Sequence, residues 1–165
     1  MMRHFWIAPA LLLAAALPVS AAAPAIVFTQ ADARAALAGN HAKGFAMQNL
    51  HAADQPGAHV STATLRRDQS EKTGLSHDHV TEIYQILDGE AVLTTGGSFP
   101  DGGKAMTSDA DPAIGPSHQG VIQGGKPAPL KVGDIVIMPP GTPHQFSRID
   151  DHVTYMVIRF STKKY

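Results

Sequence analysis

The chain has 165 residues, no cysteine, and thirteen Lys and Arg against fourteen Asp and Glu, which gives a net charge of −1 at pH 7. This length suits one domain rather than two, and the absence of a basic run argues against nucleic acid as a partner. Without cysteine, disulfide bonds and thiolate metal sites are excluded, so the fold must rest on its apolar core and any metal held by other ligands.

The N-terminal segment, residues 1–22, has the pattern of a secretory signal peptide. A basic residue, Arg3, precedes an apolar run at 5–19, and small residues follow at 20–23. The run is short for a membrane-spanning helix, which needs roughly 20 apolar residues. We therefore expect cleavage after one of the last two residues of this segment, a periplasmic or secreted product, and no stable membrane anchor.

Residues 23–60 should form a helix and edge strands ahead of the main β-domain at residues 61–165. Thr29 to Gly39 predicts the helix, because Thr29 can cap it and a carboxylate at Asp32 favours its N-terminus. Gly39 can end it, since glycine accepts the left-handed conformation that commonly follows a helix.

From Phe45 onward the chain is a succession of short apolar and β-branched runs separated by Gly, Pro and Asp, which predicts an all-β sandwich or barrel. Asp88-Gly89 predicts a tight hairpin turn. The Gly-rich stretch 96–125 predicts a long loop, either a tolerated surface loop or a lid over a pocket. The expected strands are residues 45–50, 59–67, 75–80, 82–87, 91–95, 120–123, 130–138, 144–149 and 153–160.

Two distant clusters contain side chains that commonly bind metals. The first holds His77, His79 and Glu82, and the second ends at His144 after a Pro-rich corner, residues 139–143. His77 and His79 stand two apart, so in a strand their side chains would leave on the same face. The prolines stiffen the approach to His144. Three imidazoles and one carboxylate suit a single divalent transition metal such as Fe, Mn, Zn, Ni or Cu.

These clusters resemble the two motifs of the cupin superfamily, G-(X)5-H-X-H-(X)3–4-E-(X)6-G and G-(X)5-P-X-G-(X)2-H-(X)3-N. Glu82 to Gly89 and Gly133 to His144 match that spacing. The chain departs from the motifs in having two residues between His79 and Glu82, two between Gly74 and His77, and Arg148 at the final Asn.

The resemblance covers roughly residues 65–160. It implies an all-β fold, the double-stranded β-helix of the cupin barrel, with the short N-terminal helix outside it. It also implies one metal site, and the ligands that the resemblance implies are His77, His79, Glu82 and His144.

Strand alternation predicts the surroundings of this site. Counting from Glu82 places Tyr84 and Ile86 on the metal-facing side, and counting from His144 places Phe146 there. An apolar pocket with one phenol suits a small organic ligand. A tyrosine in such a strand is more often a core or rim residue than a hydrogen-bond donor to a reacting group.

Two further features leave alternatives open. Arg66-Arg67, at a strand end, could bind an anionic ligand through whichever side chain faces inward, or could be a solvated strand end. His118, in the long loop, is the other histidine that could reach the pocket.

The sequence supports two classes of function. One is an exported metalloenzyme acting on a small organic molecule, with a dioxygenase ranked first among cupin reactions and an isomerase or lyase as alternatives. The other is a non-catalytic barrel that binds or stores a small molecule. If Glu82 cannot reach the metal, the site falls to three histidines and the second class gains. We also expect a homodimer, because a sheet of this size has edges to protect.

Overall fold

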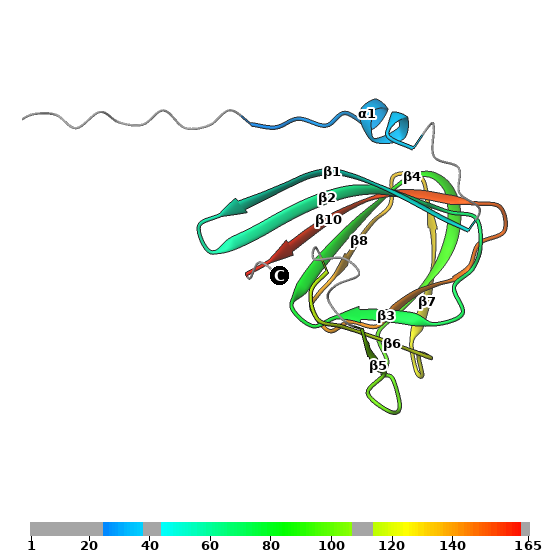
Figure 1. Ribbon diagram of the computed structural model, residues 1–165. Coiled ribbons are helices and arrows are strands. Elements are labelled where there is room, and N and C mark those ends of the chain that lie inside the picture. Colours follow the sequence, from blue (N-terminus) through cyan, green and yellow to red (C-terminus); the bar gives the residue numbers. More distant parts are fainter. Residues whose placement is uncertain (1–24, 38–43, 107–113, 163–165) are drawn as a thin grey trace, which may run out of the picture.

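The computed structural model describes residues 25–37, 44–106 and 114–162 (Figure 1). The expected signal peptide, residues 1–22, lies outside the described residues, as does Gly39 at the expected end of the helix. Within the described part of the chain, no helix combines the length and hydrophobicity needed to cross a membrane.

The N-terminal helix is confirmed and is short. Helix α1 spans Gln30–Ala35 and begins with a capping box, in which the Thr29 hydroxyl accepts a hydrogen bond from the Asp32 amide and the Asp32 carboxylate accepts one from the Thr29 amide. The Arg34 guanidinium donates to the Leu87 carbonyl at 2.5 Å, and Ala33 is buried. These contacts hold α1 outside the barrel (Figure 1).

The rest of the described chain is built from strands, as expected from the apolar runs. The 96–125 stretch is less irregular than predicted, because two short strands, β5 and β6, lie within it. The strands are β1 (Phe45–Gln55), β2 (Ala58–Arg67), β3 (Gly74–His77), β4 (Val80–Thr95), β5 (Lys104–Met106), β6 (Ser117–Gly120), β7 (Lys126–Lys131), β8 (Ile135–Met138), β9 (His144–Arg148) and β10 (Val153–Ser161).

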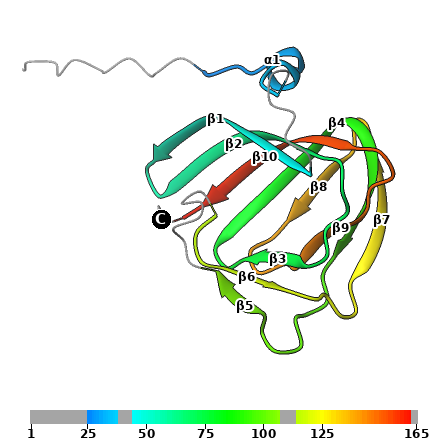
Figure 2. The ribbon, with the colours of Figure 1, turned by 45° about the vertical axis from the view of Figure 1, so that its right-hand side comes forward.

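The strands pair antiparallel in two sheets that curl around one interior (Figures 1 and 2). One sheet has the order β1-β2-β10-β4-β8. The other has the order β7-β4-β9-β3-β6-β5. Because β4 belongs to both, the two sheets are continuous at one side. The predicted all-β, cupin-like barrel with one short helix is confirmed.

The hairpin predicted at Asp88-Gly89 is wrong, since β4 runs straight through these residues. Opposite β10 the register shifts between Ile86 and Asp88, which leaves Leu87 as the extra residue of a β-bulge. Gly89 has φ +72°, and a Cβ there would lie 2.1 Å from the His152 carbonyl oxygen. A glycine at positive φ serves a bulge as well as a turn, and here it lets β4 pass from one sheet to the other.

Four other expected strands differ in extent: β1 extends to Gln55, and the strand expected at 120–123 lies at 117–120 as β6. The run 130–138 is split at Gly133, which has φ +94°, into the end of β7 and the separate strand β8. The strand expected at 75–80 ends at His77, and residues 78 and 79 form a bend before β4. This early end matters for the metal site.

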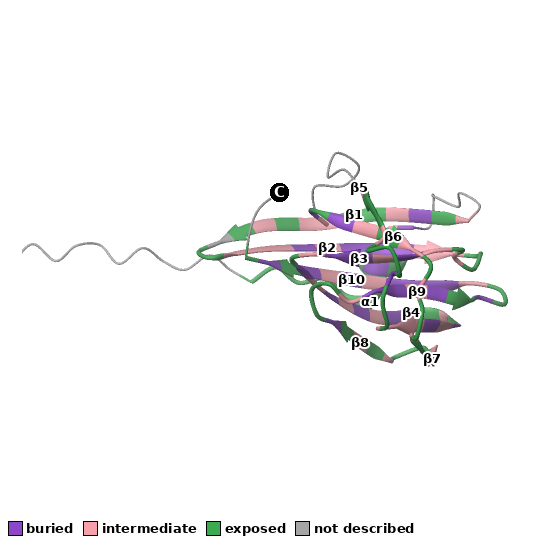
Figure 3. Ribbon diagram, turned by 90° about the horizontal axis from the view of Figure 1, so that it is seen from below, coloured by how far each residue is buried: buried purple, intermediate pink, exposed green. Residues whose placement is uncertain are grey.

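The core occupies the concave faces of both sheets. From Tyr155 to Ser161, buried side chains alternate with more exposed ones along β10 (Figure 3), so Tyr155 and Val157 point inward, and Val153 is also buried. β2 runs unbroken through residue 60, the expected end of the N-terminal segment. The buried core cluster is Ala63, Leu65, Tyr84, Ile86, Ala91, Leu93, Met138, Phe146, Ile149, Val153, Tyr155 and Val157.

Candidate metal centre

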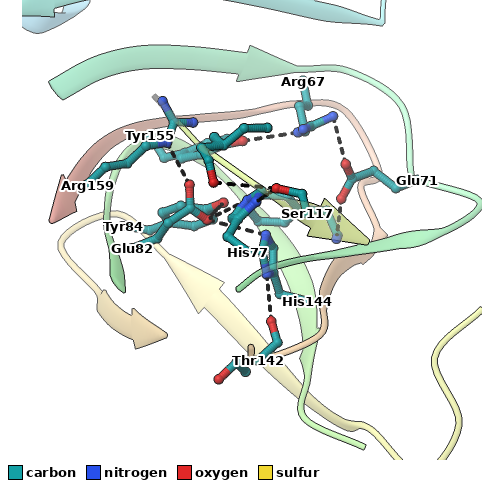
Figure 4. A network of polar contacts seen from close by, with 12 residues as sticks. Arg67, Glu71, His77, Glu82, Tyr84, Ser117, Thr142, His144, Tyr155 and Arg159 are labelled. Atoms are coloured by element: carbon teal, nitrogen blue, oxygen red, sulfur yellow. Dashed lines mark hydrogen bonds and ion pairs between the residues drawn. The ribbon is translucent and has the colours of Figure 1, made fainter. Parts of the chain in front are cut away.

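Three of the four predicted ligands converge inside the barrel. His77 ends β3, Glu82 lies near the start of β4 and His144 begins β9, and all three side chains are buried. One ligand atom from each lies within 4.8 Å of the others. The Nε2 atoms of His77 and His144 are 3.5 and 3.4 Å from the same Glu82 oxygen, Oε2 (Figure 4).

Hydrogen bonds at the far side of each imidazole fix its tautomer. His144 Nδ1 lies 3.1 Å from the Thr142 carbonyl oxygen, which can only accept, so Nδ1 carries the proton. His77 Nδ1 lies 2.8 Å from Ser117 Oγ, whose own proton is donated to the Gly115 carbonyl at 3.0 Å. The serine oxygen therefore accepts from His77. Both Nε2 lone pairs are left facing Glu82, as in metal-binding histidines.

Glu82 is held from two directions. Arg159 Nε donates to Oε1 at 2.8 Å, and the Tyr84 hydroxyl donates to Oε2 at 3.0 Å. Burial alone would raise the pKa of Glu82, but the Arg159 charge opposes burial, and that pKa lies below its usual value. The carboxylate is therefore ionised, as a metal ligand must be.

His144 and Tyr84 are both neutral at physiological pH. Burial lowers the pKa of His144, against the opposing effect of the Glu82 charge, so its imidazole stays unprotonated. Burial and the nearby Glu82 charge raise the pKa of Tyr84 well above its usual value, so its phenol keeps its proton and can donate.

The spacing of the three donors fits a metal ion better than it fits direct hydrogen bonds. Contacts of 3.4 and 3.5 Å are longer than the roughly 2.7–3.2 Å of an N–H···O bond. Two donors bound at about 2.0–2.2 Å, at an angle of roughly 90–110°, lie about 2.8–3.6 Å apart. Two imidazoles and one carboxylate are also the donor set of the facial triad that holds Fe(II) in many oxygenases.

His79 does not join this cluster. Because β3 ends at His77, the two histidines do not share a strand face, and the premise that paired them is wrong. His79 is exposed in the following bend and lines a separate surface pocket with Asp78 and Phe160. The residue two before His77 on the same strand face is Leu75, and it lines the interior cavity.

This placement shifts the match to the cupin motif by two residues. Leu75-Ser76-His77 occupies the H-X-H positions, with leucine in place of the first histidine. Four residues then separate His77 from Glu82, which is the motif's own spacing and the signal that could have identified the correct pair. Glu82 reaches the site, so the alternative of a three-histidine site without it is not what the geometry shows.

An interior cavity of about 210 Å³ adjoins the three ligands. Tyr84 and Phe146 line it as predicted, whereas Ile86 is buried in the core and is not among the lining residues. The side chains around the cavity are Phe45, Met47, Leu65, Arg67, Glu71, Leu75, His77, Glu82, Tyr84, Ile114, His144, Phe146, Tyr155 and Arg159.

Sequence reasoning missed several polar residues of this site. Arg159 stands at an inward position of β10, in alternation with Tyr155 and Val157. A charged residue at a core-facing strand position is the sequence feature that could have identified it as part of the site. Ser117 carried no signal, because it lies in the stretch expected to be a loop. His118, the other candidate, pairs with Asp78 at 3.0 Å and is not among the residues lining the cavity.

Comparison with known proteins finds only chains of similar trace and leaves the activity open. No protein-family model matches the chain. No curated protein sequence matches it either. Its chain trace resembles a cupin 2 conserved barrel domain protein from Rhodopseudomonas palustris, with a TM-score of 0.47 and 16% identity over 76% of this chain and 68% of that one.

Two enzymes also have a similar trace. One is the DMSP lyase DddQ from Ruegeria pomeroyi, with a TM-score of 0.45 and 20% identity over 81% of this chain and 54% of that one. The other is an oxalate oxidase, with a TM-score of 0.45 and 22% identity over 76% and 55%. The chain spans about half the length of these two proteins, and the likeness is one of fold alone. By its sheet topology and paired motifs, the protein is a cupin-like barrel with a buried His-Glu-His potential metal site.

Proposed function

We propose that the protein is a metalloenzyme that holds one divalent transition metal at His77, Glu82 and His144 and acts on a small organic molecule, with a dioxygenase as the first-ranked reaction. The observation that carries this proposal is the convergence of two tautomer-fixed imidazoles on one ionised, buried carboxylate. Fe(II) is the ion that this donor set favours, although Mn, Zn, Ni and Cu accept the same ligands.

The residues around the ligands support this role. Arg159 fixes Glu82 by its Oε1 and leaves Oε2 facing the histidines. Tyr84 donates its phenolic proton to Oε2 at 3.0 Å and so helps to orient the carboxylate toward the histidines. When bound, a redox-active ion would supply one-electron chemistry toward O₂, and Zn would supply Lewis acidity.

Elemental analysis of the purified protein tests the metal site. We expect about one transition-metal ion per chain in the native protein and almost none in a His77→Ala, His144→Ala double variant, because one carboxylate cannot hold the ion alone. A His79→Ala variant is the matched control and should keep its metal. Equal metal content in the native protein and the double variant would overturn the proposal.

A non-catalytic barrel that binds or stores a small molecule is the second candidate. It is favoured by the hydrogen bonds of Glu82 to Arg159 and Tyr84, which satisfy both carboxylate oxygens without an ion. A small-molecule library scored for both melting temperature and O₂ uptake separates the classes. Product formed with O₂ uptake supports the dioxygenase, and product without it supports an isomerase or lyase. A strong melting shift without product, in fully metallated protein, supports the binding barrel.

Export and dimerisation also remain proposals. N-terminal sequencing of the protein from its native host would identify cleavage near residue 22. For the dimer, the supporting observation is an exposed apolar strip on the outer face, with Ile135 and Ile137 on β8 and Phe160 on β10. β8 pairs with β4. Light scattering that gives a monomer at micromolar concentration would overturn the dimer.

A further inference from the structure

The two adjacent arginines at the end of β2 lie in different surroundings. Arg67 lines the cavity that holds the metal ligands. Arg66 is not among the lining residues described, and it donates to the Thr154 hydroxyl at 3.3 Å. Strand alternation separates the two side chains. The inward side chain of the Arg66-Arg67 pair is therefore Arg67.

Arg67 is held in a fixed orientation. Its Nε donates to the Tyr155 hydroxyl at 3.1 Å, and its Nη1 lies 2.9 Å from Glu71 Oε1. The guanidinium carbon also lies 4.6 Å from the centre of the Phe45 ring. Glu71 is itself positioned by the Phe146 amide, which donates to Oε2 at 2.8 Å. A guanidinium has five N–H donors, so donors remain for a ligand after these two polar contacts.

Figure 4 shows how Arg67 and the metal ligands are arranged. Arg67 and Glu71 lie at one side of the network, Arg159 lies at the other, and Tyr155 lies between the two arginines. The Tyr155 ring is 4.7 Å from the Tyr84 ring, centre to centre. Arg67 lines the same cavity as His77, Glu82 and His144, so one ligand within it can lie against both the arginine and the metal site.

The charges around the cavity point to an anionic ligand. The lining residues with formal charges are Arg67, Glu71, Glu82 and Arg159, and these sum to zero. The imidazoles are neutral when they bind metal, and the phenols of Tyr84 and Tyr155 carry no formal charge. A bound divalent ion would leave two uncompensated positive charges in a buried cavity, which is costly.

The size and walls of the cavity limit the ligand further. A volume of about 210 Å³ is roughly seven times the volume per molecule of liquid water, about 30 Å³. Met47, Leu65, Leu75 and Phe146 give it apolar walls. The space thus suits an organic molecule of a few carbon atoms with charged ends.

We infer that the ligand is a small organic anion with two negative groups, one directed at the metal and the other bound by Arg67. This inference rests on the proposed metal site. It assigns to Arg67 the recognition of the second anionic group and names short dicarboxylates as the ligand chemistry.

Titration of the Co(II)-loaded protein with three probes of equal chain length tests this inference. The probes are succinate, butanoate and butanamide, which carry two, one and no negative charges, and the visible Co(II) absorption reports binding. We expect succinate to bind most tightly and butanamide most weakly. In Arg67→Gln, succinate affinity should fall about tenfold or more, since a charge-assisted pair is lost, while butanoate affinity should change little.

Two further variants sharpen the outcome. Arg66→Gln is the matched control and should bind all three probes as the native protein does. Glu71→Gln removes a competing anion from Arg67, so its succinate affinity should rise about threefold or more, and it tests the proposal even if Arg67→Gln does not fold. A purely structural Arg67–Glu71 pair would not produce this rise.

The results distinguish this inference from the proposed function. If the Co(II) bands do not appear in the native protein, the metal site itself fails and this inference fails with it. If the bands appear but succinate binds no better than butanamide, the inference alone is overturned. It is also overturned if Arg67→Gln folds and its succinate affinity matches that of the native protein.

Discussion

Histidines meet carboxylates both at the surface and in the interior of this protein, and the shorter contacts are at the surface. The interior contacts are the two Nε2 to Oε2 distances of 3.5 and 3.4 Å at Glu82. The surface contacts are His59 to Asp54 at 2.7 Å, His118 to Asp78 at 3.0 Å, His152 to Asp151 at 2.7 Å and His152 to Asp88 at 3.3 Å.

The difference shows what sets the spacing in each place. A side chain at the surface can turn until it makes a hydrogen bond, so the pairs close to ordinary bonding distance. In the interior, His77 is tied to Ser117, His144 to the Thr142 carbonyl and Glu82 to Arg159. These contacts hold the donors apart. A longer distance between well-held groups is therefore the mark of a site, whereas a short one marks a satisfied pair.

The largest test of this comparison removes the interior charge. Glu82→Gln should lower the free energy of unfolding of the metal-free protein by about 3–5 kcal/mol, because the buried Arg159 loses its charge partner. Asp78→Asn, which breaks a surface pair, should cost less than about 1 kcal/mol. Urea unfolding measures both.

A second substitution, at Arg159, checks that the loss of stability comes from leaving the Arg159 charge unpaired. Adding Arg159→Met to Glu82→Gln should recover a large part of the loss, since both buried charges are then gone. If Glu82→Gln cost no more than Asp78→Asn, the interior carboxylate would be no different from a surface one.

The second test compares the two neighbouring histidines. His77→Ala should weaken Co(II) or Zn binding by on the order of 100-fold or more, because it removes a ligand. His79→Ala should change the affinity by less than about threefold, because its side chain is exposed outside the cluster. Isothermal titration calorimetry gives both constants. Equal losses in the two variants would mean that both histidines bind the metal.

The smallest test is a pH effect at a surface pair. The hydrogen bond from His152 is the main cause that lowers the pKa of Asp88 from its usual value of 3.8. A carboxylate with a lowered folded-state pKa stabilises the protein above its unfolded pKa and loses this contribution as pH falls through the folded one. The Asp88 side chain is 57% exposed, so water screens the effect.

Asp88→Asn should therefore destabilise the protein by less than about 1 kcal/mol at pH 7. The difference from the native protein should shrink as pH drops below 3.8 and vanish in stronger acid. Denaturant unfolding at several pH values measures this. A difference that grows toward low pH would contradict the assigned shift.

Much of the site could be predicted because it follows from local patterns. The motif spacing gave His144 and Glu82, and alternation along β4 and β9 gave Tyr84 and Phe146. The helix followed from its capping box. In each case the deciding residues lie within a few positions of one another, so strand or helix geometry is enough.

The errors arose where strand ends or distant pairing decide. Whether His79 or Leu75 shares a face with His77 depends on where β3 stops, and that is set by its pairing with β6 and β9. Arg159 meets Glu82 because β10 pairs with β4 at Arg159 and Glu82 themselves. The Asp88-Gly89 prediction failed because the same dipeptide suits a hairpin and a bulge.

One backbone hydrogen bond joins the two segments that carry the metal-site histidines. The Gly141 amide, in the Pro-rich corner before His144, donates to the His77 carbonyl at 2.7 Å. The strand that ends in one histidine is thereby clamped to the corner that presents the other. The two segments are brought together during folding, so the conformational entropy of arranging the two histidines is lost before any ion binds. An ion would therefore bind to a preorganised site, and its exchange would require no refolding of the chain.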